Sequence, residues 1–454
     1  MATRRNAEEV AEALGEYLGG AVTDLRRLSG GASRVTSSFD LSVGEEVRPL
    51  ILQQVRGDGV AQSGIVPVER ALLEAARSAG VPVPAVVAMG EHDRLGSGWL
   101  VVERLEGETI PRKILRDPEW AGARVALTAQ CGRALAAIHS IKPEEIAGLA
   151  PRDPLRDPLS FLDALGEVRP ALEFGVRWLG AHRPAAGRTV TVHGDFRSGN
   201  LLVGPDGLRA VLDWELAHAG DPAEDIGWLC APAWRFGGRG SVGGFGPLDE
   251  LLSSYSGAGG EEIDLERVHW WQVYATLKWA TICALQASTH LSGTTRSVEL
   301  AAIGRRVCES EWDLLALLGV VPPPPVSDLG VAADVLPPFG RPTATELVEA
   351  VREYLEEGAM AKSVGRAKFE ARVARNALLV VERQLRLGPT LARAHHERLA
   401  ALGQRDDTTL AAAIRSGDLD ADWTDVGVAL AASARDQLLV ANPAYVTSVP
   451  AASA

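Results

Sequence analysis

The segment from Thr191 to Glu215 constrains the fold of this chain more than any other feature of its sequence. Residues 191–200 read TVHGDFRSGN, so a short apolar run leads into a polar loop that contains His193, Asp195 and Asn200. A second apolar run then ends at Asp213. Gly, Asp, Ser and Asn are common in surface turns, and each of them alone would indicate little. Their ordered placement between strand-like runs predicts a site built from one loop and one strand end.

The spacing of Asp195 and Asn200 matches the H-x-D-x-x-x-x-N loop of enzymes that transfer phosphoryl groups. In that loop the aspartate receives the proton of the acceptor hydroxyl, and the asparagine binds magnesium. Asp213 stands where the second magnesium ligand belongs. Because such enzymes do little covalent work, they need side chains that hold magnesium and nucleotide and that neutralise charge on the moving phosphoryl group.

The run from Val192 to Leu229 resembles the signature of the aminoglycoside phosphotransferase-like family, which shares the two-lobed fold of protein kinases. The resemblance extends over residues 5–320. It is carried by LDWE at 212–215, GDP at 220–222 and WRFG at 234–237. These motifs look more like the branch related to the kinase domains fused to acyl-CoA dehydrogenases than like the antibiotic-resistance enzymes.

This resemblance implies an α+β protein with a two-lobed, protein-kinase-like fold and four parts. The first lobe combines an antiparallel sheet with a helix, the second is mainly helical, and a small all-α domain follows. We place the boundaries as follows: N-lobe 1–105, C-lobe 106–320, proline-rich linker 321–340 and C-terminal domain 341–454. Consecutive prolines in the linker cannot continue a helix and favour an extended spacer.

Helical periodicity and capping signals predict the elements of the C-terminal domain. Thr343 and Glu346 form a capping-box pattern at the start of the first helix. A helix over 369–387 is predicted to stop at Gly388-Pro389. Further helices are expected over 391–401, 408–415 and 424–442. A helical domain of this kind is a candidate for homo-oligomerisation.

The N-lobe contains a glycine turn between strands predicted at 22–28 and 34–43. Gly30, Gly31 and Ser33 belong to this turn, which in the kinase reading covers the phosphates of the nucleotide. A Gly-Gly hairpin is also common without any ligand. The prediction that this turn binds nucleotide therefore depends on the position of the turn ahead of the catalytic loop.

The third strand, predicted at 49–55, departs from the family pattern. Relatives carry Lys or Arg at the position of Gln53, and a neutral amide can hydrogen-bond a phosphate but supplies no charge. Arg56 is close enough in sequence to compensate. Glu69, in the next predicted helix, stands where the family's glutamate orients the basic residue. It is expected either to pair with Arg56 or to face solvent.

The remaining site predictions follow from the same resemblance. Glu103 closes an apolar strand at the expected hinge, where backbone groups usually hold the adenine edge. Arg197 either faces the γ-phosphate, supplying the charge that Gln53 lacks, or is an exposed loop residue. Asp225 resembles the aspartate that braces the backbone of the catalytic loop. His193 is expected to support the site without taking part in the chemistry. Glu215 is expected either to support the site in the same way, by positioning metal-bound water or the loop, or to be an exposed carboxylate at a strand end.

Composition limits the classes of partner. The net charge of −13 argues against a broad nucleic-acid-binding surface. The N-terminal residues lack the apolar core of a secretory signal, and no apolar run is long enough to span a bilayer. The four cysteines are widely spaced and fit buried thiols, so we expect a cytoplasmic protein without membrane partners.

These observations predict an ATP- and Mg-dependent phosphotransferase that acts on the hydroxyl group of a small molecule. The branch resemblance favours a hydroxyacyl-CoA or a related hydroxylated metabolite as acceptor. An aminoglycoside is a second candidate, since an acidic protein attracts a polycation. A nucleotide-binding pseudokinase scaffold is a third, and Gln53 is the residue that favours it.

Overall fold

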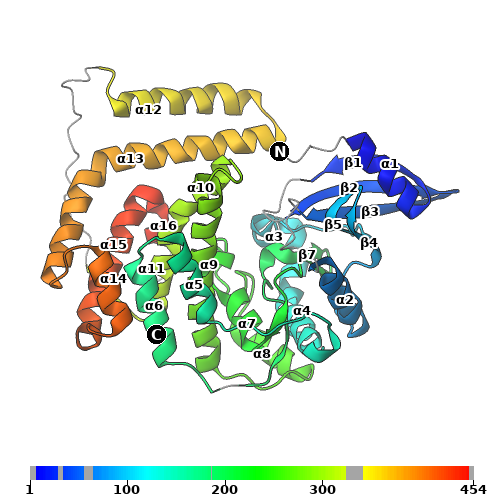
Figure 1. Ribbon diagram of the computed structural model, residues 1–454, viewed down its shortest axis with the longest axis horizontal. Coiled ribbons are helices and arrows are strands. Elements are labelled where there is room, and N and C mark those ends of the chain that lie inside the picture. Colours follow the sequence, from blue (N-terminus) through cyan, green and yellow to red (C-terminus); the bar gives the residue numbers. More distant parts are fainter. Residues whose placement is uncertain (1–6, 29–33, 56–64, 186, 324–340, 449–454) are drawn as a thin grey trace. The chain divides into compact units, whose positions relative to one another are not determined.

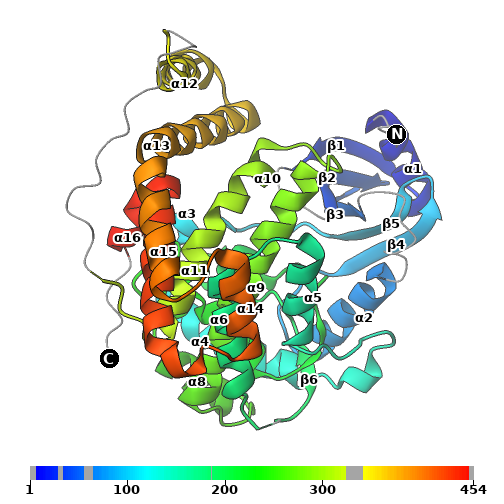
Figure 2. The ribbon, with the colours of Figure 1, turned by 60° about the vertical axis from the view of Figure 1, so that its left-hand side comes forward.

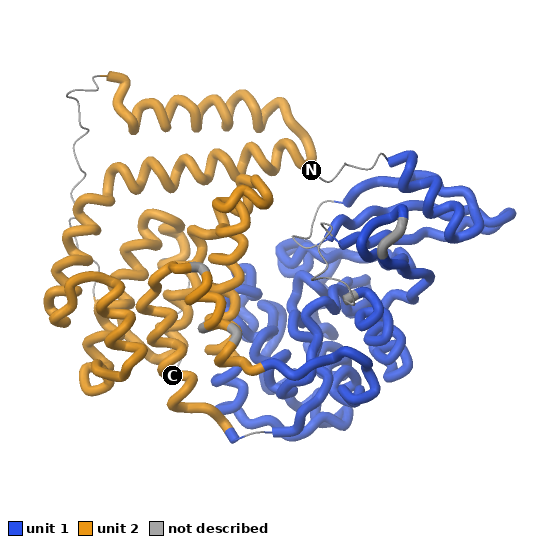
Figure 3. The backbone as a smooth tube through the Cα atoms, in the orientation of Figure 1, with its two compact units in different colours: residues 1–152, 185–271 blue, residues 153–184, 272–454 orange. Residues whose placement is uncertain are grey.

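The chain divides into two compact units (Figure 3). Unit 1 comprises residues 1–152 and 185–271, and unit 2 comprises residues 153–184 and 272–454. The structure is a computed structural model, and it describes residues 7–28, 34–55, 65–185, 187–323 and 341–448.

Unit 1 opens with helix α1 (Ala7–Leu18) and a five-stranded antiparallel sheet in the order β1-β2-β3-β5-β4 (Figure 1). The strands are β1 (Ala21–Arg27), β2 (Arg34–Val43), β3 (Glu46–Val55), β4 (Val86–Asp93) and β5 (Gly96–Glu103). Helix α2 (Ile65–Ser78) follows β3. The predicted antiparallel sheet and its helix are therefore confirmed. β4 was not predicted, because its sequence VVAMGEHD lacks a sustained alternation of apolar and polar residues.

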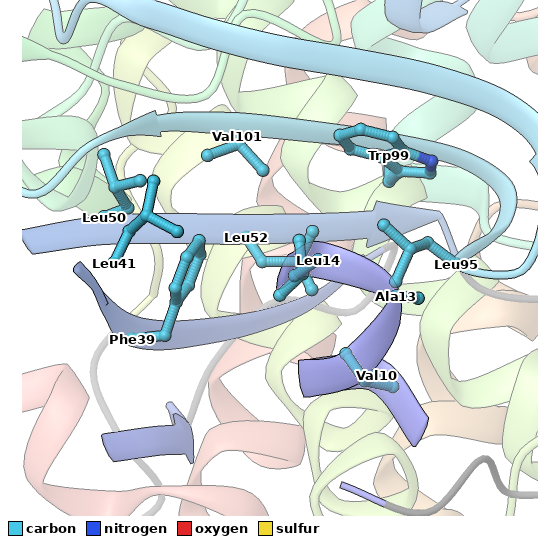
Figure 4. Close-up of a cluster of buried hydrophobic side chains, with 10 residues drawn as sticks. All are labelled: Val10, Ala13, Leu14, Phe39, Leu41, Leu50, Leu52, Leu95, Trp99 and Val101. Atoms are coloured by element: carbon cyan, nitrogen blue, oxygen red, sulfur yellow. The ribbon is translucent and has the colours of Figure 1, made fainter. Parts of the chain in front are cut away.

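The core of this sheet fixes which way its side chains point. Leu50 and Leu52 of β3 are buried with apolar side chains of β2, β5 and α1 (Figure 4). Because successive side chains of a strand point to opposite faces, Gln53 lies on the face away from this cluster. The position where the family carries its cation therefore faces away from the hydrophobic core.

The rest of unit 1 carries the segment around Asp195. Strand β6 (Val190–Val192) pairs with β9 (His218–Gly220), and β7 (Leu201–Gly204) pairs with β8 (Gly207–Val211). The helices of this part are α3 (Pro111–Arg116), α4 (Ala121–His139), α7 (Ala223–Cys230), α8 (Leu248–Gly257) and the first part of α9 (Leu265–Leu291).

Unit 2 is helical and combines segments that are far apart in sequence. Its helices are α5 (Arg156–Leu165), α6 (Pro170–Ala181), the rest of α9, α10 (Val298–Ile303), α11 (Val307–Leu317), α12 (Ala344–Glu353), α13 (Gly365–Ala401), α14 (Asp407–Ser416), α15 (Trp423–Ala441) and α16 (Pro443–Ser448) (Figure 2). Phe174 of α6 and Leu315 of α11 share one core with Leu399, Ile414 and Leu430. The four-part division of the chain remains a prediction, and a boundary near residue 320 would cut through this core.

Helix α13 corrects the prediction of a helix stop at Gly388-Pro389. The helix continues through Pro389 from Gly365 to Ala401. Proline lacks an N–H and costs about 3 kcal/mol within a helix. Leu391 and Leu399, on the far side of the proline, are both buried. Each buried leucine stabilises the fold by about 2 kcal/mol, so packing offsets the local cost.

Two breaks divide the helical segments of unit 2. Helix α5 ends at Leu165, where the following Gly166 adopts a left-handed conformation, and α6 starts at Pro170. A 3-10 turn at Gly304–Arg306 separates α10 from α11. The predicted capping box of Thr343 and Glu346 is confirmed. In the part of the chain that the structure describes, no helix combines the length and the apolarity that a membrane crossing requires.

Candidate active site

Asp225 holds the backbone of the loop that contains Asp195. Its Oδ2 accepts the N–H of His193 at 2.7 Å, and its Oδ1 accepts the N–H of Gly194 at 2.8 Å. Nε2 of His139 lies 3.2 Å from the same Oδ2. Burial alone would raise the pKa of Asp225, but hydrogen bonds from His139 and the loop backbone hold the pKa below its ordinary value.

The loop itself requires His193 and Gly194. His193 Nδ1 accepts the N–H of Asp195 at 3.2 Å, so Nε2 carries the proton and donates to the C=O of Leu212 at 3.1 Å. Burial lowers the pKa of His193, which favours this neutral form. Gly194 has φ of 75°, and a Cβ there would collide with the carbonyl oxygen of Leu216. Only glycine fits this turn.

The carboxylate of Asp195 is held by donors on three sides. Oδ1 accepts Arg197 Nε at 2.9 Å and Trp228 Nε1 at 2.8 Å, while Oδ2 accepts Asn200 Nδ2 at 2.6 Å. The guanidinium of Arg197 also lies 4.7 Å from the centre of the Trp234 ring. Arg197 is therefore paired and half-buried, so it is not the exposed loop residue that was the second expectation, and its role toward the γ-phosphate stays a prediction.

Asn200 and Asp213 are brought together by the backbone. The N–H of Leu212 donates to the C=O of Asn200 at 2.9 Å, which sets the following residue, Asp213, beside the loop. Asn200 Nδ2 also donates to the C=O of Asp195, so its amide orientation is fixed by donation. Its Oδ1 accepts no hydrogen bond from the described residues and is a hard oxygen of the kind magnesium prefers.

Asp213 lies in a crowded group of carboxylates. Its φ of 66° is a left-handed conformation that is uncommon for a residue other than glycine. Burial, together with the charges of Glu215, Asp195 and Glu69, raises the pKa of Asp213 to about 7, and Arg34 opposes this. Converging acidic oxygens favour a bound cation, because a cation relieves their mutual repulsion.

A buried ion pair joins β2 to α2. Arg34 Nη1 lies 2.5 Å from Glu69 Oε2, and Arg34 Nε lies 3.3 Å from Glu215 Oε2. Both side chains of the Arg34–Glu69 pair are buried. The expectation that Glu69 faces solvent is therefore wrong. Its other expected partner, Arg56, lies outside the described residues, and its partner here is Arg34.

The strand register places Arg34 near Gln53. In the β2–β3 ladder Arg34 lies opposite Val55, and Thr36 lies opposite Gln53. Arg34 and Gln53 are therefore diagonal neighbours on one face of the sheet, a separation that long side chains reach across. This face thus carries an arginine on β2, the strand next to the one that contains Gln53.

Two nucleotide contacts were predicted in the N-lobe, one at the hinge near Glu103 and one at the glycine turn, and the structure describes only the hinge. Glu103 is exposed at the end of β5; its N–H donates to the C=O of Ala85 at 2.9 Å, and its Oε2 lies 3.4 Å from Ala85 N. Leu105, two residues on, has an N–H with no hydrogen-bond partner among the described residues. The predicted turn residues Gly30, Gly31 and Ser33 lie outside the described residues.

The donor set fits magnesium held jointly with a nucleotide. In the described ranges, no group of three or more His, Cys, Asp or Glu side chains could hold a metal by itself. Magnesium bound to a nucleotide does not need such a cage, because it keeps waters and takes one or two protein oxygens plus phosphate oxygens. Asn200 Oδ1 and a carboxylate of Asp213 meet that requirement.

A five-stranded antiparallel sheet with a Glu-bearing helix, followed by helices around an Asp–Asn loop, defines a phosphotransferase with the two-lobed fold of protein kinases. The chain belongs to the phosphotransferase enzyme family, whose model matches residues 6–271. Residues 361–445 match a second family, described as a domain of unknown function (DUF6285).

Curated relatives and a solved structure agree with this assignment. The chain is 32% identical over 174 residues to acyl-CoA dehydrogenase family member 10 of Mus musculus, covering 35% of this chain and 16% of the mouse protein. It is 26% identical over 244 residues to family member 11 of Homo sapiens, covering 48% and 31%. The chain thus spans less than a third of the length of either relative.

The solved structure shows the fold alone. It is a Ralstonia eutropha protein assigned to the aminoglycoside phosphotransferases, with 20% sequence identity and a TM-score of 0.52. The match covers 68% of this chain and 96% of that protein.

Sequence reasoning missed Arg34 and Trp228 and gave no specific role to His139. Arg34 follows the glycine turn directly in sequence, so its position beside the turn that was predicted to cover the phosphates was a usable signal. Trp228 is three residues after Asp225 on α7, a spacing that puts both on one helix face. His139 is buried at the end of α4, and its contact is with Asp225, the residue that holds the loop backbone.

We expect Asp225→Asn to lower the free energy of unfolding by about 3 kcal/mol at pH 7, because two buried N–H groups lose a charged acceptor. The pKa of Asp225 in the folded state lies below the unfolded-state pKa of about 4. The contribution of its carboxylate to stability is therefore complete above the unfolded-state pKa and is lost as pH falls through the folded-state pKa. Urea unfolding from pH 7 to pH 3 should show the difference between the proteins shrinking in acid.

The matched control for this test is Asp206→Asn. Asp206 is exposed and its side chain makes no hydrogen bond within the described chain. The control should leave stability within about 0.5 kcal/mol of the starting value. A loss below about 1 kcal/mol for Asp225→Asn would contradict the bracing role.

Proposed function

We propose that this chain transfers the γ-phosphoryl group of Mg·ATP to a hydroxyl group of a small molecule. The observation that carries the proposal is the convergence of Asp195, Asn200 and Asp213 through the Leu212–Asn200 backbone bond and the Asn200–Asp195 side-chain bond. Magnesium, when bound with the nucleotide, neutralises charge on the phosphates.

In this mechanism Asp195 accepts the proton of the acceptor hydroxyl. A bond forms between that oxygen and the γ-phosphorus, the bond from the γ-phosphorus to the bridging oxygen breaks, and ADP leaves. Arg197 and Trp228 hold the Asp195 carboxylate toward the incoming hydroxyl. Asn200 and Asp213 would hold the metal, with Asn200 contributing Oδ1.

Arg34 supplies the fixed positive charge for the phosphates in this proposal. Glu69 and Glu215 orient its guanidinium as the glutamate of a kinase helix orients a lysine. This pair also bears on the pseudokinase alternative. The alternative was favoured by the neutral Gln53, and that argument weakens because Arg34 occupies the diagonal position on the same face.

For the acceptor we propose a hydroxylated acyl compound such as a hydroxyacyl-CoA. The support is the similarity to acyl-CoA dehydrogenase family members 10 and 11, over parts of those proteins. An aminoglycoside remains the second candidate, supported by the net charge of −13, which attracts polycations.

Homo-oligomerisation through the C-terminal helices is a further proposal, supported by exposed Leu347, Val351 and Tyr354.

An ADP-release assay across acceptor classes tests the function. We expect ADP formation from Mg·ATP to rise at least about tenfold over the acceptor-free rate with a hydroxyacyl-CoA, because only the correct hydroxyl is placed in line with the γ-phosphate. The matched control is the same acyl-CoA without the hydroxyl group. Stimulation by aminoglycosides alone would select the second candidate. No stimulation by any hydroxyl compound, with nucleotide binding intact, would favour the pseudokinase.

A further inference from the structure

A cavity of about 320 Å³ lies within unit 2, among helices that the phosphotransferase site does not use. Its walls come from Arg169 just before α6, the turn before α11, the start of α14, and helices α13 and α15. The volume is at the lower end of the range for small-molecule sites. Leu391 and Val440 contribute apolar surface, and arginine, glutamine and histidine side chains complete the wall.

One face of α13 lines the cavity, and a glycine on this face leaves part of the space open. Gln384, Gly388, Leu391 and His395 all line the cavity and recur at helical spacing. Gly388 is in a helix interior, where alanine would be more stable. A Cβ built at Gly388 would meet only Cγ of Gln384, at 3.8 Å. The missing side chain therefore leaves room that no other atom of the described residues fills.

Most charged side chains in the wall have a polar or oppositely charged partner. Arg398 Nη2 lies 2.7 Å from Asp436 Oδ2, and His395 Nε2 lies 3.1 Å from Asp407 Oδ1. Arg169, also in the wall, pairs with carboxylates behind it at Glu167 and Glu311. Because these side chains are already paired, they hold the wall of the cavity in place and are less available to a ligand.

Arg305 is the one arginine of the cavity wall without a carboxylate partner among the described residues. Its guanidinium donates to Oε1 of Gln384 at 2.6 Å, and in the portion of the chain with described positions no carboxylate lies within ion-pair distance. Gln437, across the cavity wall on α15, has a side-chain amide that forms no hydrogen bond with the described residues. The cavity thus presents one uncompensated positive charge and free amide groups beside apolar surface.

We propose that this cavity binds a small anionic metabolite. Its carboxylate or phosphate group would pair with Arg305, a short apolar segment would contact Leu391 and Val440, and Gln437 would hydrogen-bond the anion or a neighbouring polar group. A guanidinium with five donors suits both anions.

Calorimetric titration of the full chain tests the proposal with three probes: butyrate, inorganic phosphate and butyramide, the neutral counterpart of butyrate. We expect butyrate or phosphate to bind with a Kd below about 1 mM, and butyramide to bind at least about tenfold more weakly. The preferred anion shows whether the natural group is a carboxylate or a phosphate. Failure of both anions to bind would overturn the proposal. The readout is binding, so it does not depend on phosphotransfer.

Two variants locate the binding. Arg305→Gln should weaken the anion about tenfold or more, whereas Arg393→Gln, on an exposed position of α13 outside the cavity, should not. Gly388→Leu should fill the cavity and abolish binding, whereas Gly180→Leu, at an exposed helical glycine with open space, should not. Anion binding that persists in Arg305→Gln or in a folded Gly388→Leu, or that Arg393→Gln weakens equally, would overturn the proposal. Should Gly388→Leu fail to fold by circular dichroism, the surface variant Arg305→Gln decides.

Discussion

Replacing Asp195 by Asn is expected to lower kcat for phosphotransfer by about a thousandfold, because the amide cannot take the proton of the acceptor hydroxyl. The affinity for Mg·ATP should stay within about tenfold of the original, since Asp213 and the phosphate contacts are unchanged. The measurements are steady-state ADP release with saturating acceptor and calorimetric titration of Mg·ATP.

The hydrogen bonds around Asp195 make a second variant necessary. In the unaltered protein, Asn200 Nδ2 lies 2.6 Å from Oδ2 of Asp195. In Asp195→Asn the side-chain oxygen must keep accepting from Arg197 and Trp228, so the new NH2 group points at Nδ2 of Asn200. Asn200 would then flip and withdraw its Oδ1 from the metal. Asp195→Ala removes the carboxylate without creating this donor–donor contact. The two variants should lose kcat alike, while Asp195→Ala should keep the metal affinity better.

Asp213→Ala is the comparison that separates proton transfer from metal binding. It should lower the affinity for Mg·ATP by on the order of 100-fold, an effect that Asp195→Ala should not share. Equal kcat in Asp195→Ala and the unaltered protein would remove Asp195 from the chemistry. A loss of nucleotide affinity as large as that of Asp213→Ala would reassign Asp195 to the metal site.

The fold and the active-site loop could be predicted from sequence where the signal is local. The loop at 193–200 has a fixed spacing, and the N-terminal strands have clear apolar alternation. The continuous α13 could not be predicted, because Gly388-Pro389 is a strong local stop signal. Its continuation depends on Leu399 packing against α14 and α15, a contact that no local pattern reports.

The same limit applies to the charged partners in the site. The sequence shows that Gln53 lacks a charge, but it does not show which arginine lies near it on the same face of the sheet. That depends on the register of β2 against β3, which places Arg34 diagonally across from Gln53. Trp228 reaches Asp195 only through the placement of α7 beside the loop.

Replacing Arg34 by Gln is expected to lower the affinity for Mg·ATP by about 100-fold, because a buried charge facing the phosphates is lost. The same change should reduce the free energy of unfolding by about 3 kcal/mol, since Glu69 stays buried without its partner. Calorimetric titration and urea unfolding measure the two effects separately. Arg48→Gln, on an exposed position of β3, is the matched control and should change neither.

Two double variants separate the charge from its structural role. Arg34→Gln with Glu69→Gln removes both charges, so stability should largely return while nucleotide affinity stays low. Arg34→Gln with Gln53→Lys moves the cation to the diagonal position on the same face, where it can approach Glu69. That variant should recover at least about tenfold of the lost affinity. Unchanged Mg·ATP affinity in Arg34→Gln would show that the Arg34–Glu69 pair only joins β2 to α2, and that the phosphate charge comes from elsewhere.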